Sequence, residues 1–171
     1  SDVIIFATGF DAVTGAISRI HVEGKEGINL NSHWEGAPRA YLGLTSVGFP
    51  NLFFVDGPCA NGALFSPMLL LEHQVDWLMD CIKFSGLSDS SLVEAKTEYE
   101  NEWIEHMNSV GAGTLIHKAN SWYMGANIPG KPRALLSYLG GYKNYTDQTS
   151  AGSANNYAKL AITRDVDLKE R

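Results

Sequence analysis

Short apolar runs and longer periodic stretches alternate along the chain, and together they predict a mixture of strands and helices. Residues 2–6 and residues 51–56 are predicted as buried strands, because β-branched and aromatic residues follow one another there with few polar breaks. Residues 16–22 predict a more exposed strand, and residues 24–27 predict a hairpin turn after it. A buried strand needs neighbours, so we expect the partners of residues 2–6 to come from sequence that is absent here.

The strongest helix signal starts at Ser66. Ser66 suits the N-cap, and Pro67 suits the first helical position because its missing N–H would have no partner there. Apolar residues then recur at helical spacing and predict a stripe that faces the core, made of Met68, Leu71, Val75, Leu78, Met79 and Ile82.

A second helix is predicted to open at Ser91, where Glu94 completes a capping box, and to end at residues 111–113. Its apolar stripe is Leu92, Tyr99, Trp103, Met107 and Val110. A solvated face is predicted for the glutamates Glu98, Glu100, Glu102 and Glu105. Beyond this helix, residues 134–139 are predicted as a strand or short helix, and residues 149–156 as a mobile polar segment.

Composition narrows the class of protein. With 171 residues, 44% of them hydrophobic and 19% charged, the chain is typical of a globular protein with one core. A net charge of -6 without a lysine or arginine cluster argues against nucleic acid as a partner. No apolar run approaches the roughly 20 residues that cross a bilayer, so no membrane association is expected. Cys59 and Cys81 lack C-x-x-C spacing, which favours a reducing, cytoplasmic compartment and no zinc site.

Gly57-Pro58, the loop after it and the capped helix form an arrangement that can hold an electron-rich group. Unpaired N–H groups and the positive end of the helix dipole at residues 66–69 would favour such a group, for example the pyrimidine edge of a reduced flavin. Taken alone, however, the residues favour an ordinary strand, loop and helix of a sheet protein.

Residues 121–133, Ser-Trp-Tyr-Met-Gly-Ala-Asn-Ile-Pro-Gly-Lys-Pro-Arg, hold too many aromatic, glycine and proline residues for a regular helix or strand. Their G-x-x-x-x-G-K pattern matches the opening of a phosphate-binding P-loop, but Pro132 stands where a P-loop needs Ser or Thr. A nucleoside triphosphatase is therefore disfavoured. Trp122 either presents its indole to a ligand or fills the core as one of four tryptophans, and Lys131 is predicted as a solvated surface lysine.

Other catalytic patterns are missing from the sequence. The five histidines lack metal-ligand spacing and are predicted as surface or structural residues, so no metal site is indicated. No G-x-S-x-G elbow supports a hydrolase.

Three segments together resemble the C-terminal part of the Baeyer-Villiger monooxygenase family: residues 7–11 (Ala-Thr-Gly-Phe-Asp), Gly57-Pro58 and residues 121–133. Members of this family are flavoenzymes that use NADPH and O2 to convert ketones into esters or lactones. The resemblance implies an α/β fold class, as the C-terminal portion of a flavoprotein with two Rossmann-like dinucleotide-binding domains for FAD and NADP. Residues 1–11 would be a strand and hinge leaving the NADP domain. Residues 12–171 would be the C-terminal part of the FAD-binding domain, with the NADP-contacting tryptophan loop.

The same resemblance implies which residues form the site. The cofactor-binding residues would be Thr8, Gly9, Gly57, Pro58, Ser66, Met68 and Trp122. The wall of the substrate pocket would be Ala63, Leu64 and Phe65, whose apolar character suits a ketone. The implied cofactors are FAD and NADP, and the implied partners are a ketone, O2 and the missing N-terminal part of the enzyme. No catalytic residue is assigned to this chain.

The sequence departs from the family by what it lacks. It has no G-x-G-x-x-G for FAD or NADP, no family fingerprint and no active-site arginine, so we expect these in the N-terminal part and expect this chain alone to be inactive. Two alternatives stay open: a non-catalytic fragment or binding module, and part of a related N- or S-oxidising flavin monooxygenase. Bound flavin would separate a monooxygenase from a module without the chemistry.

Overall fold

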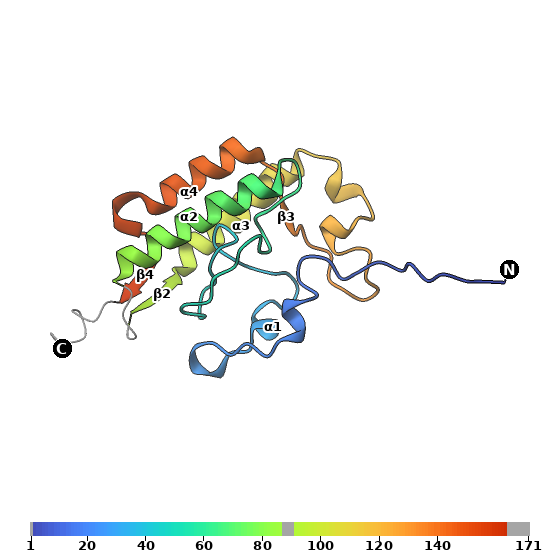
Figure 1. Ribbon diagram of the computed structural model, residues 1–171, viewed down its shortest axis with the longest axis horizontal. Coiled ribbons are helices and arrows are strands. Elements are labelled where there is room, and N and C mark those ends of the chain that lie inside the picture. Colours follow the sequence, from blue (N-terminus) through green and yellow to red (C-terminus); the bar gives the residue numbers. More distant parts are fainter. Residues whose placement is uncertain (1, 87–90, 164–171) are drawn as a thin grey trace.

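The computed structural model describes residues 2–86 and 91–163. Its body contains the helices α2 (Pro67–Ser85), α3 (Thr97–Ala112) and α4 (Gly141–Tyr157). α2 and α4 lie side by side, and the N-terminal segment runs away from this body (Figure 1). No helix in the described ranges is both long and apolar enough to cross a membrane.

One core joins the three long helices through large aromatic side chains. Trp103 of α3 stacks on Tyr138, with ring centroids 5.0 Å apart, and meets Tyr145 of α4 edge-on at 6.1 Å. Trp77 of α2 packs edge-on against Tyr157 at 5.2 Å. These rings are buried, and apolar burial of this size dominates the stability of a small domain.

The strands are short and come in two pairs. β2 (Leu92–Ala95) pairs antiparallel with β4 (Leu160–Thr163), and β1 (Asn61–Gly62) pairs in parallel with β3 (Ser137–Tyr138). Single turns of 3-10 helix occupy Ile17–Arg19, Lys25–Gly27, Ile116–Lys118 and Trp122–Met124. The short helix α1 (Leu30–His33) begins a second, smaller apolar cluster made of Leu30, Trp34, Ala40, Phe49 and Phe54.

The structure corrects the predicted strands. Residues 2–10 form no strand, and Val3, Ile4, Ile5 and Phe6 are 72–84% exposed, because the described part of the chain offers them no strand to pair with. The strand predicted at residues 51–56 is also wrong, because Asn51 and Asp56 take positive φ angles of 61° and 53°. Within this segment only Phe53 forms an isolated bridge, to Thr45. In place of a strand at 16–22 there is the turn Ile17–Arg19, whereas the predicted hairpin turn is supported by a bridge between Glu23 and Asn29.

The prediction for α2 was right in its start and only partly right in its face. Ser66 is the N-cap and Pro67 the first helical residue, but Met68, Val75 and Met79 are exposed. The buried residues of α2 are Leu70, Gln74, Trp77, Leu78, Cys81 and Ser85, of which only Leu78 belongs to the predicted stripe. A polar residue, Gln74, is among them because its amide is satisfied by Tyr145 and by the backbone of Asp56, which periodicity alone does not reveal.

The region after α2 was only partly predicted. Residues 92–95 form β2 rather than the first turn of a helix, because Val93 and Ala95 are buried by pairing with β4, and α3 starts at Thr97. The end of α3 before Gly113 is confirmed, as is the part of its stripe made of Tyr99, Trp103, Met107 and Val110, but Leu92 lies in β2 and is exposed. Residues 134–139 contain β3, one of the two predicted outcomes. In α4, Ala154, Asn155 and Asn156 leave helical backbone angles.

Candidate functional site

Two segments that the sequence analysis singled out, residues 7–11 and residues 121–133, meet in the structure. The Asn127 side-chain amide donates a hydrogen bond of 2.9 Å to the carbonyl oxygen of Phe10. Lys131 forms an ion pair with Asp11 and donates to the Thr14 hydroxyl at 2.7 Å. The two motifs are thus parts of one surface, although more than a hundred residues separate them in sequence.

The tryptophan loop, residues 121–136, has a rigid internal structure. The Ser121 hydroxyl accepts a hydrogen bond from the Tyr123 N–H at 3.3 Å, and Gly125 ends the Trp122–Met124 turn with a φ of 64°. The Arg133 guanidinium donates to two carbonyl oxygens, at 2.9 Å to His117 and 2.6 Å to Ala119. These contacts fix the loop to the turn that precedes it, so Trp122 projects from an ordered support.

Trp122 does not fill the core, which removes one of its two predicted roles. Its exposed fraction is 40%, against 8% for Trp34, 6% for Trp77 and 3% for Trp103. Its ring lies 3.9 Å from that of Tyr123, and its indole N–H donates to none of the described residues. An exposed indole with a free donor is suited to contact a ligand or another part of a protein.

A cleft of about 480 Å³ lies beside the contact between the two motifs. Asp11 and Thr14 line one side of it, Pro129 and Lys131 another, and Trp34 and Pro38 take part in its wall. This cleft was not predicted from the sequence. The available signal was one charged residue in each motif, Asp11 in the first and Lys131, of opposite charge, in the second. The prediction that Lys131 is a solvated surface residue was wrong, because its side chain is only 17% exposed.

The start of α2 carries the predicted features of a cofactor-facing surface. The Ser66 side chain does not cap the helix, so the N–H groups of the first turn have no side-chain acceptor. Met68 and Leu64 are 67% and 59% exposed, while Ala63 and Phe65 are half-buried. Among the described residues, the buried acceptor Asn61 Oδ1 has no hydrogen-bond partner. An apolar surface with free N–H donors at a helix start can contact the edge of a flat, electron-rich ring such as a flavin.

The loop with Gly57 and Pro58 is held by a buried polar chain. Gln74 accepts from the Asp56 N–H at 2.7 Å and donates to the Tyr145 hydroxyl at 2.9 Å, which donates to the Leu42 carbonyl at 2.9 Å. Burial raises the pKa of Tyr145 and of Asp56 above their usual values. The phenol therefore stays protonated as a donor.

Gly57 and Pro58 themselves are buried. A Cβ at Gly57 would lie 2.4 Å from Phe54 Cβ and 2.7 Å from the Gly43 carbonyl oxygen. Because no larger side chain fits there, the packing alone accounts for this glycine.

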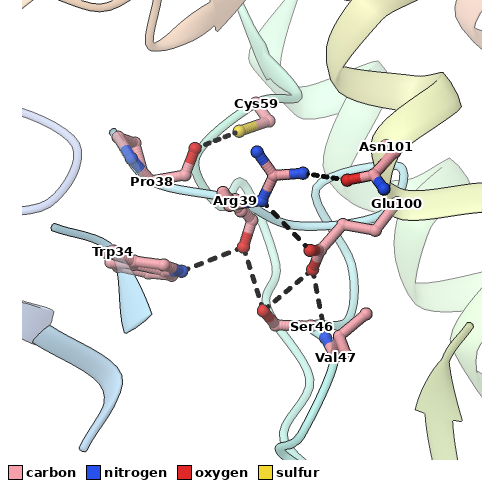
Figure 2. Close-up of polar contacts among 8 residues, drawn as sticks. All are labelled: Trp34, Pro38, Arg39, Ser46, Val47, Cys59, Glu100 and Asn101. Carbon is pink, nitrogen blue, oxygen red and sulfur yellow. Dashed lines mark hydrogen bonds and ion pairs between the residues drawn. The ribbon is translucent and has the colours of Figure 1, made fainter. Parts of the chain in front are cut away.

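A second polar network, centred on Glu100, joins α3 to the segment of residues 39–47 (Figure 2). The carboxylate of Glu100 accepts from the Val47 N–H at 3.0 Å and pairs with the Arg39 guanidinium at 3.3 Å, and the Ser46 hydroxyl lies 3.1 Å from it. Glu100 is only 2% exposed, so its prediction as part of a solvated face was wrong. The other glutamates of that predicted face are exposed: Glu98, Glu102 and Glu105. This carboxylate ties α3 to residues 39–47.

The network continues toward Gly57-Pro58 through Cys59. Its thiol donates to the Pro38 carbonyl oxygen at 3.3 Å, and its N–H bonds the Leu136 carbonyl at 2.9 Å. Burial raises the pKa of Cys59 to about 12, so this thiol is an inert packing group. Cys59 also takes a φ of 71°, a strained conformation that the surrounding contacts maintain.

The remaining candidates occupy structural or exposed positions. His73 and His106 are half-buried beside the hydroxyls of Thr149 and Tyr138, and burial lowers the pKa of both imidazoles. Thr8 and Gly9 lie exposed in the N-terminal segment. Across residues 2–86 and 91–163, no hydrogen bond joins Thr8, Gly9, Ser66 or Met68 to the tryptophan loop, and no group of three acidic, histidine or cysteine side chains is arranged to hold a metal.

Similar proteins place these features in context. No family model matches the chain. It is 39% identical over 163 residues to the acetone monooxygenase (methyl acetate-forming) of Gordonia sp. (strain TY-5) and 36% identical over 166 residues to a Baeyer-Villiger monooxygenase of Pseudooceanicola batsensis. It is also 36% identical over 144 residues to the phenazine N-monooxygenase of Lysobacter antibioticus. These matches cover 95%, 97% and 84% of this chain but only 31%, 30% and 26% of the relatives.

Solved structures give the same result. Cyclohexanone monooxygenase from Rhodococcus sp. Phi1 bound to NADP+ superposes with a TM-score of 0.87 at 37% identity, and OTEMO in complex with FAD and NADP with a TM-score of 0.82 at 33% identity. Each match covers 95% of this chain and 30% of the solved chain. The chain therefore has the fold of one portion of these proteins.

Proposed function

We propose that this chain, which is homologous to a segment of the Baeyer-Villiger monooxygenases, forms part of an FAD- and NADPH-dependent enzyme that inserts one oxygen atom of O2 next to a ketone carbonyl. The products would be an ester or lactone, NADP+ and water. The observation that carries the proposal is the docking of the tryptophan loop on residues 10–14, because it joins two of the three segments of the family resemblance in one surface.

Bound FAD would supply the electron transfer and the oxygen chemistry, and this chain would supply part of its surroundings. The exposed start of α2 at Ser66 and Met68 would contact the flavin edge, and Ala63, Leu64 and Phe65 would form an apolar wall for the ketone. Exposed Trp122 would meet the nicotinamide part of NADPH. Thr8, Gly9 and the Gly57-Pro58 loop would lie near the cofactors and support this arrangement.

The rest of the enzyme would come from a region outside this chain. Residues 1–11 would leave an NADP-binding domain, and residues 12–171 would complete an FAD-binding domain. The relatives' greater length and the absence of a G-x-G-x-x-G motif in this sequence support this division. The exposed side chains of Val3 to Phe6 would then be covered by that region. A cytoplasmic location is supported by Cys59 and Cys81, which are both buried free thiols.

The test uses the full-length protein that carries this sequence. Its intact mass should lie well above 18.7 kDa, and its purified form should show flavin absorbance. With NADPH, O2 and a set of linear and cyclic ketones, it should form esters or lactones that contain one atom of ¹⁸O from labelled O2. A colourless protein that neither oxidises NADPH nor labels any product would overturn the proposal and leave the binding module as its replacement.

The role of Trp122 has its own experiment. In the full-length protein, Trp122→Ala should raise the KM for NADPH about tenfold while FAD stays bound, because the exposed indole would be lost without disturbing the core. Tyr142→Ala removes a half-buried aromatic side chain that packs on Phe65 and should leave the KM for NADPH unchanged. Unchanged NADPH kinetics in Trp122→Ala would exclude this role.

A second candidate is oxidation of an aromatic nitrogen, favoured by the similarity to the phenazine N-monooxygenase. The same labelling experiment with a phenazine or another N-heterocycle distinguishes the two reactions. An N-oxide without any ester would favour this second candidate.

A further inference from the structure

Lys131 is bound on two sides although it lies in a loop. Its ammonium pairs with the Asp11 carboxylate and donates to the Thr14 hydroxyl at 2.7 Å. The side chains of Lys131 and Asp11 are 17% and 29% exposed, in contrast to the surface pair Lys143–Asp147 at 86% and 59%. A shielded ion pair is less screened by water and salt, so its geometry is held more firmly than that of a surface pair.

The backbone of the turn to which Lys131 binds, residues 11–15, is strained. Val13 has a φ of 67°, which is an outlier for a β-branched residue. The chain folds so tightly that a Cβ at Gly15 would lie 2.2 Å from the Asp11 carbonyl oxygen. Strained turns persist only where surrounding contacts hold them, and Lys131 binds the two residues, Asp11 and Thr14, that flank the strained position.

The loop that carries Lys131 is itself stiff. Pro129 and Pro132 restrict the backbone on both sides of it, Gly130 has a φ of 77°, and the Lys131 N–H bonds the Ile128 carbonyl at 3.2 Å. Asn127, from the same loop, makes a second attachment through Phe10. Two contacts from one stiff loop fix both the distance and the angle between the loop and the turn.

We propose that Lys131 is a positioning residue whose ammonium couples the tryptophan loop to the strained turn at residues 11–15, so that Trp122 is held where NADPH binds. The Lys131 ammonium is neutralised by its ion pair with Asp11 and does not bind a cofactor phosphate. Lys131 and Asp11 then act as one unit, and loss of either releases both segments. The link to NADPH rests on the proposed function, whereas the coupling of the two segments does not.

The experiment uses the full-length protein with Lys131→Met, Asp11→Asn, the double variant and Lys131→Arg. Met keeps the apolar stem that packs near Gly125, and Asn keeps the size of Asp11, so each single variant removes mainly charge. Each single variant should raise the KM for NADPH about tenfold with kcat changed less, and the double variant should be no worse than either one. Lys131→Arg should restore most of the affinity, and Lys143→Met serves as the surface-lysine control, with no effect.

Hydrogen exchange of the NADPH-free protein is the second measurement. In Lys131→Met and in Asp11→Asn, backbone amides of residues 10–15 and of residues 122–134 should both exchange faster than in the wild type, and those of α3 should not. Additive effects on the KM, or an Asp11→Asn variant that behaves as wild type, would mean that Lys131 acts alone. Unchanged exchange in both segments would overturn the coupling itself. A wild-type protein without flavin or NADPH oxidation would instead refute the proposed function, and the exchange measurement would still test the coupling.

Discussion

The helical body and the tryptophan-loop region, residues 2–15 together with 121–136, are stabilised in different ways. In the body, α2, α3 and α4 bury Trp77, Trp103 and Tyr145 in one continuous core. In the tryptophan-loop region, a few polar contacts from Lys131 and Asn127 hold the N-terminal segment. A core distributes stability over many contacts, whereas a surface held by single contacts is sensitive to each of them. The body therefore provides most of the stability, whereas the attachment of the N-terminal segment to the tryptophan loop depends on a few polar contacts.

The largest effect should come from removing a core tryptophan. Trp103→Ala should lower the free energy of unfolding by about 4 kcal/mol, because it deletes a buried ring that stacks on Tyr138 and leaves a cavity. Urea denaturation of the full-length protein, followed by circular dichroism of the helices, measures this change.

Trp122→Ala is the matched control in the other region. It should change the free energy of unfolding by less than about 0.5 kcal/mol, since surface substitutions seldom do more. Equal losses for the two tryptophans would refute the contrast, because they would mean that Trp122 contributes as much to the core as Trp103 does.

Removing the buried carboxylate of Glu100 tests whether polar contacts also stabilise the helical body. Glu100→Ala should cost about 3 kcal/mol, because it leaves Arg39, Ser46 and the Val47 N–H without their shared acceptor. Glu98→Ala, an exposed change on the same helix, should cost less than about 0.5 kcal/mol. A small loss in Glu100→Ala, close to that of the control, would show that water replaces the carboxylate at no cost.

Features encoded by neighbouring residues were predictable from sequence. Ser66 and Pro67 mark the start of α2, and the stripe of Trp103 and Met107 identifies the inner face of α3, since the preference of proline for the first helical turn and helical spacing are local. The strands were not predictable in this way. β2 depends on β4, some 65 residues further along the chain, so Leu92 to Ala95 could equally be assigned to a helix from local sequence.

Buried polar residues caused most of the remaining errors. Gln74 and Glu100 look like surface residues in sequence, and only partners from distant segments make their burial possible. The same holds at the site. Trp122 and its loop were recognised from an unusual composition, but the pairing of Lys131 with Asp11 depends on a fold that brings positions 11 and 131 together.

Gln74 provides a test of intermediate size. Gln74→Leu should cost about 2 kcal/mol, because the buried N–H of Asp56 loses its acceptor, and the Gly57-Pro58 loop should exchange its amide hydrogens faster. Glu72→Leu, an exposed position on the same helix, is the control and should have little effect on either measurement. If Gln74→Leu is as stable as the wild type, apolar packing alone supports the loop.

The smallest effect should come from His73, a histidine of α2 that contacts Thr149 of α4. Burial lowers the pKa of His73 in the folded state, below the value of about 6.5 that an unfolded chain has. The unfolded state then binds more protons between these two pKa values, so the contribution of His73 to stability is complete above about pH 6.5 and is lost as the pH falls through the folded pKa. His73→Gln should therefore lose less stability than the wild type between pH 7 and pH 5 in urea denaturation. His21→Gln, a change at an exposed histidine, should follow the wild type, and identical pH dependence in all three proteins would show that His73 titrates equally in both states.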